Sequence, residues 1–452
     1  MPEHPGPDRR ALTGWGRTAP TVATLRPTDA DHVADLVRAA GPRGVLARGL
    51  GRSYGDAAQN AGGDVVVLDA DGPIDLDRDR AVATVGAGVS LDRLIRTLLP
   101  RGFFVPVTPG TRQVTVGGAV AADVHGKNHH VHGTFGSHVR ALSLVGADGQ
   151  PQVLTPGGTP DRFWATVGGM GLTGVVTAAE VAVLPVETSW IRVDTDRAAN
   201  LDELYSLMRH DDDYTYSVAW IDLLARGRRM GRSVLTRGEH ARVGELPASR
   251  AAAPLDFAAR ERLRAPAWVP DGLMSRLGVR AFNELWFRKS PARRRDEIQS
   301  LGGFFHPLDG VAQWNRLYGR RGLVQYQFVV PLGAEAAMTE AVDRISSAGH
   351  ASFLAVLKRF GPENPGLLSF PTQGWTLALD LPADPGLAPL LDGLDDLVVR
   401  AGGRIYLAKD SRARPEAVAA MYPRWEDFRR IRREMDPEGV FASDLSRRLG
   451  LT

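Results

Sequence analysis

The stretch RGLGRSYGD, Arg48–Asp56, holds three glycines in nine residues and follows an apolar run that begins at Val45. A strand that leads into a glycine-rich loop is typical of dinucleotide sites. The Rossmann fingerprint, however, needs G-x-G-x-x-G opening a helix, and here the third glycine, Gly55, comes one residue late. The following residues, 56–63, are too few and too glycine-rich for a crossover helix. The sequence therefore argues against an NAD site and favours a loop whose closely spaced backbone amides bind a pyrophosphate.

Two further glycine-containing segments follow within about 130 residues of the first. The segment PGTRQVTVGGAVAADVHGKNHH, 109–130, has adjacent glycines at 117 and 118 and a hydroxyl at Thr115, and FWATVGGMGLTG spans 163–174. A plain glycine turn would not explain this repetition. Three such loops suit a long, extended cofactor that the protein contacts along its whole length.

Length and composition narrow the class of protein. At 452 residues the chain exceeds what one hydrophobic core usually supports, so two domains are expected. The sequence has no run of about 18 apolar residues and no apolar stretch in residues 1–10, so we expect neither a transmembrane segment nor a Sec signal peptide. It contains no cysteine, which excludes disulfides, thiolate metal sites and cysteine nucleophiles. A net charge of +3 is too small to predict nucleic-acid binding.

Lysine is rare in this chain, although basic residues are not. Of 55 basic residues only four are lysines, namely Lys127, Lys289, Lys358 and Lys409. A lysine that remains in so arginine-rich a chain either marks a position that needs a compact ammonium group or survives by chance.

Hydrophobic periodicity predicts mixed short strands and helices. The expected strands are 45–48, 64–68, 81–85, 139–145, 153–154, 172–184, 216–221, 323–330 and 404–407, and the expected helices are 91–99 and 425–435. The turn at 146–149 predicts a hairpin. Residues 245–280 hold few signals and are a candidate for a mobile loop region. Its apolar residues Trp268, Leu273 and Met274 could cover a prenyl chain or face a membrane.

The three glycine-containing segments together resemble the FAD domain of the vanillyl-alcohol oxidase/p-cresol methylhydroxylase superfamily. Other stretches extend the resemblance almost from end to end: ELWFRKS at 284–290, LYGRRG at 317–322, QYQFVVP at 325–331, AKDSR at 408–412 and FASDLSRRL at 441–449. The resemblance implies an α+β fold with an FAD-binding domain built from both chain ends, residues 1–188 and 404–452. A substrate-binding domain with an antiparallel sheet, 189–403, is inserted between them.

Within this superfamily the chain is similar to members that oxidise the 2′-hydroxyl of decaprenylphosphoryl-β-D-ribose. An NAD-dependent reductase then completes the epimerisation to the arabinose donor for the cell-wall arabinan of actinobacteria. Such a polyprenyl-phosphate substrate implies a cytoplasmic location or peripheral contact with the membrane at the cell envelope. The alternatives are an alditol or aldonolactone oxidase of the same superfamily, or a flavin- or sugar-binding protein without turnover. Loss of His125 or Lys409 would favour the last, and both are present.

Many members of the superfamily tether the flavin through a histidine in the first glycine loop. This chain has Arg52 at that position, and a guanidinium has no nucleophilic nitrogen at accessible pH. The sequence therefore predicts FAD that is bound non-covalently, with Arg52 in contact with a phosphate or a carboxylate.

The resemblance also assigns the site residues. The expected catalytic residues are His125, Lys409 and Tyr54. The expected cofactor contacts are Ala47, Arg48, Gly49, Leu50, Gly51, Arg52, Ser53, Tyr54, Gly55, Asp56, Ala57, Gly110, Thr115, Val116, Gly117, Gly118, Ala122, Asp123, Val124, His125, Val176 and Tyr406. The expected substrate-side residues are Lys127, Trp220, Gln325, Gln327, Lys358, Ala378 and Lys409.

Two of these assignments have a physical reason of their own. An ammonium group at Lys409 could stabilise the N1–C2 carbonyl edge of the flavin or a developing alkoxide, whereas its structural alternative is an ion pair with Asp410 or another carboxylate. Strand alternation places Gln325 and Gln327 on one face, where their amides suit sugar hydroxyls or a phosphate.

Five of the eleven histidines lie between His125 and His138, so a metal site is an alternative interpretation of this segment. Asp123 is the one nearby carboxylate, and the segment has no H-x-x-x-H pair on an expected helix. We therefore expect no metal, and we expect His129, His130 and His132 to make structural hydrogen bonds. At Ala378 and Thr376 the sequence departs from related mycobacterial members, which carry cysteine and asparagine there, so the shape of the substrate pocket is expected to differ.

Overall fold

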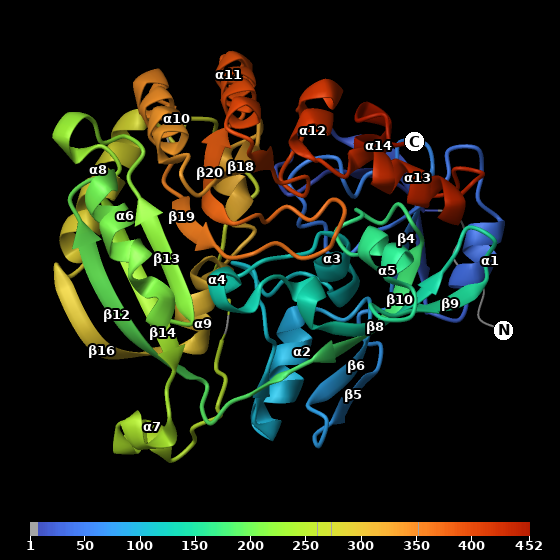
Figure 1. Ribbon diagram of the computed structural model, residues 1–452, viewed down its shortest axis with the longest axis horizontal. Helices are drawn as coiled ribbons and strands as arrows, with labels where there is room; N and C mark the ends of the chain where they lie inside the picture. Colours follow the sequence, from blue (N-terminus) through green and yellow to red (C-terminus); the bar gives the residue numbers. More distant parts are fainter. Residues whose placement is uncertain (1–7, 260, 273, 351) are drawn as a thin grey trace.

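The computed structural model describes residues 8–259, 261–272, 274–350 and 352–452 (Figure 1). Leu273, one of the residues expected to cover a prenyl chain, lies outside these ranges. Among the helices of the described residues, none is both long and apolar enough to cross a bilayer.

The first glycine loop follows a strand of a small sheet near the N-terminus. Its strands β1 (Asp8–Leu12), β2 (Thr21–Thr28), β4 (Asp64–Leu68) and β3 (Val45–Ala47) lie in that order, and helix α1 (Val33–Arg38) precedes β3. Strands β3 and β4 are parallel neighbours, yet residues 48–63 between them contain no helix. The expectation that no crossover helix follows the loop is therefore confirmed, and the Rossmann interpretation is excluded.

A five-stranded sheet follows, in the order β5 (Ile74–Asp77), β6 (Val82–Gly86), β10 (Val175–Ala182), β8 (Val139–Val145) and β9 (Pro151–Leu154). The predicted hairpin is the antiparallel pair β8–β9. Helix α2 (Leu91–Leu98) begins where the Ser90 hydroxyl accepts a hydrogen bond from the Arg93 amide, and it buries its leucines in the core. Helices α3 (Val116–Ala121), α4 (His129–His132) and α5 (Pro160–Thr166) and the short pair β7 (Phe103–Phe104) and β11 (Leu184–Pro185) complete this part.

The middle of the chain forms an antiparallel sheet of eight strands. Their order is β16 (Arg293–Ser300), β12 (Trp190–Ala198), β14 (Ser233–His240), β13 (Tyr216–Ile221), β19 (Ala355–Phe360), β20 (Gly374–Pro382), β18 (Leu323–Pro331) and β21 (Arg404–Ile405). Helices α6 (Leu201–Arg209), α10 (Glu335–Ala348) and α11 (Leu387–Arg400) pack their apolar residues against this sheet in the largest core cluster. The predicted antiparallel sheet is therefore present.

The C-terminal segment returns to the first glycine loop. Helices α12 (Pro415–Met421), α13 (Trp425–Met435) and α14 (Asp444–Arg448) lie beside the N-terminal strands in Figure 1. The Arg448 guanidinium donates to both carboxylate oxygens of Asp56, at 2.8 and 2.9 Å, and the Val45 amide donates to the Val440 carbonyl at 2.8 Å. Segments that are almost 400 residues apart therefore pack as one layer.

The remaining elements surround the large sheet. They are α7 (Ala248–Ala251), α8 (Arg276–Lys289), α9 (Leu301–Phe305) and the parallel pair β15 (Leu263–Arg264) and β17 (Val311–Ala312). Short 3₁₀ helices lie at Leu99–Arg101, Phe135–His138, Asp211–Asp213, Gly227–Arg229, Val243–Glu245, Pro307–Gly310 and Trp314–Tyr318.

Several predicted boundaries need correction. The region 245–280 is not structureless, since it contains α7, β15 and the start of α8. The strand expected at 172–184 is β10 followed by the separate pair-forming β11, because the chain bends at the Val183–Leu184 junction to pair with β7. The strand expected at 404–407 ends at Ile405, because the chain turns there and the Lys409 and Asp410 amides both donate back to the Tyr406 carbonyl.

Candidate active site

Three neighbouring strands of the large sheet and the turn after β21 carry the candidate site. In the register of these strands, Gln325 lies opposite Asp380, Gln327 opposite Ala378, and Lys358 opposite Thr376. Tyr326 points to the other face, where its hydroxyl donates to Asp395 at 2.9 Å. The predicted alternation is therefore confirmed, and both glutamine amides lie on one face of the sheet.

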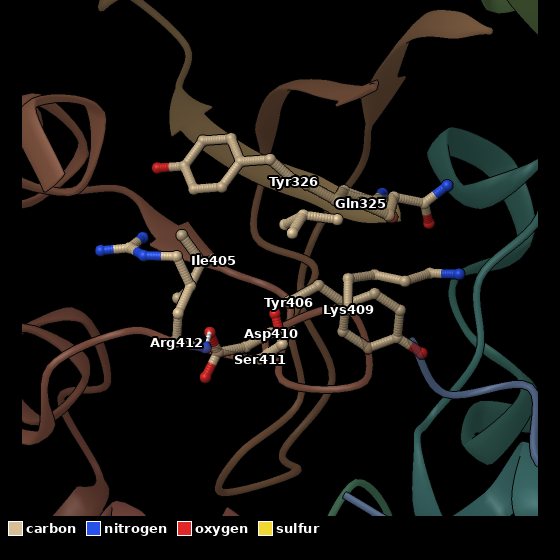
Figure 2. A pocket seen from close by; sticks show the side chains of 10 residues that line it. Gln325, Tyr326, Ile405, Tyr406, Lys409, Asp410, Ser411 and Arg412 are labelled. Atoms are coloured by element: carbon tan, nitrogen blue, oxygen red, sulfur yellow. Dashed lines mark hydrogen bonds between the residues drawn. The ribbon is translucent and has the colours of Figure 1, made fainter. Parts of the chain in front are cut away.

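Asp380 and Lys409 form the charged centre of this face. Asp380 is fully buried, and one of its oxygens accepts a hydrogen bond from the Gln325 amide nitrogen. Its other oxygen, Oδ2, has no hydrogen-bond partner among the described residues. Burial raises the pKa of Asp380 and lowers the pKa of Lys409, while attraction between the two groups opposes both shifts. Figure 2 shows the Gln325 and Lys409 side chains extending in the same direction.

Lys409 also contacts Tyr54 from the first glycine loop. The Lys409 Nζ lies 4.2 Å from the centroid of the Tyr54 ring. The two segments meet because the Tyr54 amide donates to the Ala408 carbonyl at 2.9 Å. Burial, with Asp380 nearby, raises the pKa of Tyr54 well above its usual value, so the phenol stays protonated and is a hydrogen-bond donor at neutral pH.

Of the sequence alternative for Lys409, an ion pair with Asp410 or another carboxylate, the part that names Asp410 is wrong. The Asp410 carboxylate instead accepts hydrogen bonds from Arg448 at 2.8 Å and from the Arg412 and Ala413 amides. Within the described part of the chain, Lys409 takes part in no salt bridge. The carboxylate that acts on the pKa of Lys409 is that of Asp380, which sequence reasoning missed.

His125 is held by Gln327. The Gln327 amide nitrogen lies 2.9 Å from His125 Nε2 and 3.3 Å from the Thr376 hydroxyl. Because an amide nitrogen can only donate, His125 Nε2 accepts and the proton of the neutral ring resides on Nδ1. Burial and the neighbouring lysines lower the pKa of His125 well below its usual value, so the ring is neutral at pH 7. The buried Nδ1 has no partner in the described residues and is therefore a free donor.

Three of the four lysines converge on this site. Burial lowers the pKa of Lys127 and of Lys358 to about 7, and for each of them another lysine adds repulsion, Lys358 for Lys127 and Lys409 for Lys358. The Lys127 ammonium donates to the Phe304 carbonyl at 2.6 Å, and the Lys358 ammonium lies 5.6 Å from the Phe360 ring centroid. The fourth lysine, Lys289, ends the exposed helix α8. With a pKa of about 7, Lys127 and Lys358 are about half protonated at neutral pH, and a bound anion would hold both as ammonium groups. The three lysines together therefore indicate a site for an anion.

The predicted cofactor residues come from segments that the fold brings together. The first glycine loop approaches the second so closely that a Cβ at Gly49 would collide with the Thr115 hydroxyl. That hydroxyl caps α3 by accepting from the Gly118 amide at 3.1 Å. The Tyr406 hydroxyl donates to the Ala122 carbonyl at 2.7 Å, which joins the turn after β21 to the second segment.

Individual members of the predicted cofactor set have different surroundings. Leu50 is exposed, whereas Val176 in β10 is buried. The Arg48 guanidinium donates to the Ala58 and Thr13 carbonyls. The others lie in the same two loops and their flanks: Ala47, Gly51, Ser53, Gly55, Ala57, Gly110, Val116, Gly117 and Val124.

Two predicted cofactor residues have side chains that contact other groups of the protein. Asp123, at φ 39°, accepts hydrogen bonds from the Gly136 amide, Asn364 and Ser369, so its carboxylate locks the second segment to residues 364–369. Arg52 lies 3.9 Å over the Trp15 ring and donates to the Gln113 carbonyl at 3.1 Å. The carboxylate contact expected for Arg52 is therefore absent from the described residues, because the aromatic face takes its place.

The histidine-rich segment is structural in part. His129 Nδ1 accepts from the Gly361 amide at 3.2 Å, and His130 bonds to the Tyr214 carbonyl at 2.8 Å. His132 offers its carbonyl to the His138 ring at 2.9 Å. Over the described ranges, no group of three or more potential ligands could hold a metal ion.

The substrate-side residue Trp220 lies on β13 at the margin of the site, where its indole nitrogen donates to the Phe353 carbonyl at 3.2 Å. Ala378 lies on β20 between Thr376 and Asp380. Since residues two apart on a strand share a face, Asp380 could have been found from its spacing to these two residues.

The arrangement fits an FAD group with its substrate. His125 Nδ1 and Asp380 Oδ2 are buried polar atoms that the described protein atoms leave without a partner. The three ammonium groups suit the negative charge of a reduced flavin and of a phosphorylated substrate. The loops that hold Gly49 and Thr115 supply close backbone approach for the rest of the cofactor.

Comparison with known proteins agrees with this interpretation. A family model described as an FAD binding domain matches residues 21–155, and one described as D-arabinono-1,4-lactone oxidase matches residues 384–449. The predicted FAD cofactor is thereby confirmed.

Three relatives cover most of the chain. A decaprenylphosphoryl-β-D-ribose oxidase from Mycolicibacterium smegmatis is 47% identical over 452 residues, which cover 98% of each chain. An uncharacterised protein from Streptomyces coelicolor is 46% identical over 375 residues, 80% of this chain and 100% of the relative. An alditol oxidase from a Streptomyces species is 26% identical over 97% of this chain and 99% of its own.

Proposed function

The chain belongs to the decaprenylphosphoryl-β-D-ribose oxidase family of FAD-binding oxidoreductases, and on this premise we propose that it oxidises the 2′-hydroxyl of decaprenylphosphoryl-β-D-ribose to a 2′-keto group. The convergence of Lys127, Lys358 and Lys409 beside Gln325 and Gln327 carries the proposal. A phosphodiester has negative charge for the ammonium groups to bind, and the amides suit ribose hydroxyls. A neutral alditol needs hydroxyl partners but no such charge, which favours this substrate over the alditol alternative.

The residues of the site have complementary tasks in such a reaction. The oxidation removes a hydride, one proton with two electrons, from the carbon and a proton from the hydroxyl, and FAD when bound would accept the hydride. Asp380, with its raised pKa and its free Oδ2, is placed to accept that proton. Lys409 stabilises the developing alkoxide, and Tyr54 and His125 Nδ1 supply hydrogen-bond donors.

FAD is proposed to be bound without a covalent link. Arg52 occupies the position of the tethering histidine, and its guanidinium is held between the Trp15 ring and the Gln113 carbonyl. This side chain has no nucleophile for a bond to the flavin.

The proposed domains follow the sheets. Residues 1–188 and 404–452 form the FAD-binding domain, supported by the contacts of α14 with the first glycine loop. Residues 189–403 form the substrate domain, supported by the large sheet. The second boundary departs from the sheets, because β21, which opens the C-terminal segment, is an edge strand of the large sheet and pairs with β18.

A keto product requires a reducing partner if the ribose is to become an arabinose. We assign this step to an NAD-dependent reductase, which would return hydrogen to C2′ from the opposite face. The product would serve cell-wall arabinan synthesis, in the cytoplasm or peripherally at the cell envelope where the lipid substrate resides.

The position of oxidation tests the proposal. FAD-loaded enzyme is mixed anaerobically with a short-chain prenylphosphoryl ribose for one turnover, and the product is reduced with borodeuteride. We expect deuterium at C2′ of a mixture of ribose and arabinose. Deuterium at another carbon, or recovery of unlabelled ribose alone, would reject the proposal.

A further inference from the structure

Helix α8 presents large apolar side chains to solvent. Leu277 is 80% exposed and Leu285 66% exposed, and Phe282 and Trp286 are each more than 40% exposed. Trp268, in the loop eight residues before the helix, is also 80% exposed. Single exposed apolar residues are normal, but four on a helix of 14 residues form a patch that needs an explanation.

The spacing of these residues makes one continuous face. Residues 277, 281 and 285 repeat at four, as do 278, 282 and 286, and all six are apolar or glycine. The opposite face is attached to the protein through the buried Val279 and Asn283, and the Asn283 amide donates to Asp222 at 2.7 Å. The helix is therefore attached through the buried face that holds Val279 and Asn283, and its larger apolar face is directed outward.

The charged residues of the helix are mostly of one sign. It carries four basic residues, Arg276, Arg280, Arg288 and Lys289, all exposed, and one acidic residue. That residue, Glu284, is paired with Arg232 at 2.7 Å and with Arg288 at 2.6 Å. Arg276, Arg280 and Lys289 pair with no carboxylate among the described residues, and an outward apolar face flanked by these basic groups complements an anionic lipid surface.

A row of aromatic rings leads from this face into the candidate site. Phe282 lies 5.9 Å from Phe353, and Phe353 lies 5.9 Å from Tyr318, measured between ring centroids. Tyr318 is buried in the same cluster as Tyr54, which contacts Lys409. The row therefore joins the surface of α8 to the neighbourhood of the buried charges through a line of ring contacts.

We propose that α8 is a membrane-docking helix that lies on an anionic phospholipid bilayer and admits a prenyl chain along the Phe282–Phe353–Tyr318 row. The docking itself needs only the exposed face and the basic residues, whereas the path for the prenyl chain rests on the proposed function. Figure 1 shows α8 at the end of the molecule formed by the large sheet, opposite β9. This separation leaves the FAD-binding segments clear of the bilayer.

Vesicle sedimentation tests the docking without any assay of activity. FAD-loaded full-length protein is mixed with phosphatidylcholine vesicles that contain a quarter phosphatidylglycerol, or with phosphatidylcholine alone. We expect binding to the anionic vesicles, weakened by salt, and at least a tenfold loss of affinity in the double variant Leu277→Glu/Leu285→Glu. Both side chains face solvent, so the thermal unfolding midpoint should not change. The matched control is Val153→Glu on β9, a residue as exposed as Leu285, which should bind like the wild type.

A second arm separates this inference from the proposed function. The double variant should reduce its flavin normally with a short, water-soluble prenylphosphoryl ribose but slowly with decaprenylphosphoryl ribose in vesicles. Equal vesicle binding by variant and wild type would overturn the docking, as would a wild type that forms a dimer through α8 and ignores vesicles. A wild type that binds vesicles but oxidises neither ribose substrate would reject the proposed function and leave the docking in place.

Discussion

The amide nitrogen of Gln327 lies 2.9 Å from Nε2 of His125, and this contact fixes the tautomer of the histidine. His125 belongs to the second glycine segment and Gln327 to the large sheet, so the bond joins two parts of the chain that are 202 residues apart. It leaves the buried Nδ1–H free to donate to a ligand.

Replacing Gln327 with leucine should therefore slow flavin reduction about fivefold, because one hydrogen bond worth about 1 kcal/mol no longer orients the ring. Anaerobic stopped-flow spectroscopy measures this rate. Thr376→Val is the control, since it removes the other partner of the same amide and should have a smaller effect. Equal rates in Gln327→Leu and the wild type would show that the contact does not position His125 for the reaction.

Lys409→Ala should fold and retain FAD, yet lose on the order of 10²–10³ in the rate of flavin reduction, because a well-placed charge is lost next to the reacting centre. Lys409→Arg should also be impaired, since a forked guanidinium does not fit beside Tyr54 and Asp380 as an ammonium does. Near-normal rates of flavin reduction in both variants would show that Lys409 has a structural role and no catalytic one.

The pH dependence of flavin reduction should depend on Asp380. Its raised pKa means that the carboxylate form, the form able to accept a proton, is lost as the pH falls toward and below neutrality. We therefore expect the wild-type rate to rise with pH through this range. Asp380→Asn keeps an acceptor for Gln325 and should give a low rate without this rise. An unchanged acid limb in Asp380→Asn would assign the proton acceptor to another group.

FAD should be released when the protein is denatured. Because Arg52 cannot form a bond to the flavin, acid precipitation should leave the yellow colour in the supernatant. Flavin fluorescence that stays with the polypeptide on a denaturing gel would contradict non-covalent binding.

Local patterns predicted much of the fold, because each element satisfies its own periodicity. The spacing of Leu91, Leu94, Ile95 and Leu98 is that of an amphipathic helix, and all four are buried in α2. The alternation of Gln325, Tyr326 and Gln327 likewise corresponds to β18. Helix α8 was missed although its apolar residues repeat at helical spacing and Ser275 caps it, and both were usable signals.

The charged centre of the site lay beyond local reasoning. The family resemblance assigned Lys127, Lys358 and Lys409 to the substrate side, but local patterns alone could not show that they converge, since strand pairing and loop packing bring them together. Asp380 was missed for a similar reason. Its importance comes from its burial opposite Gln325 and beside Lys409, which depends on the register of β18 with β20.

The most direct test of the account is a comparison of substrates by flavin bleaching. FAD-loaded enzyme is mixed anaerobically with a short-chain prenylphosphoryl ribose, with ribose 5-phosphate and with xylitol, and the loss of visible flavin absorbance is followed. If the three lysines serve a phosphorylated lipid-linked ribose, the prenyl compound bleaches the flavin fastest and xylitol does not bleach it. Fast bleaching by xylitol with none by the prenyl compound would contradict the account and identify an alditol oxidase.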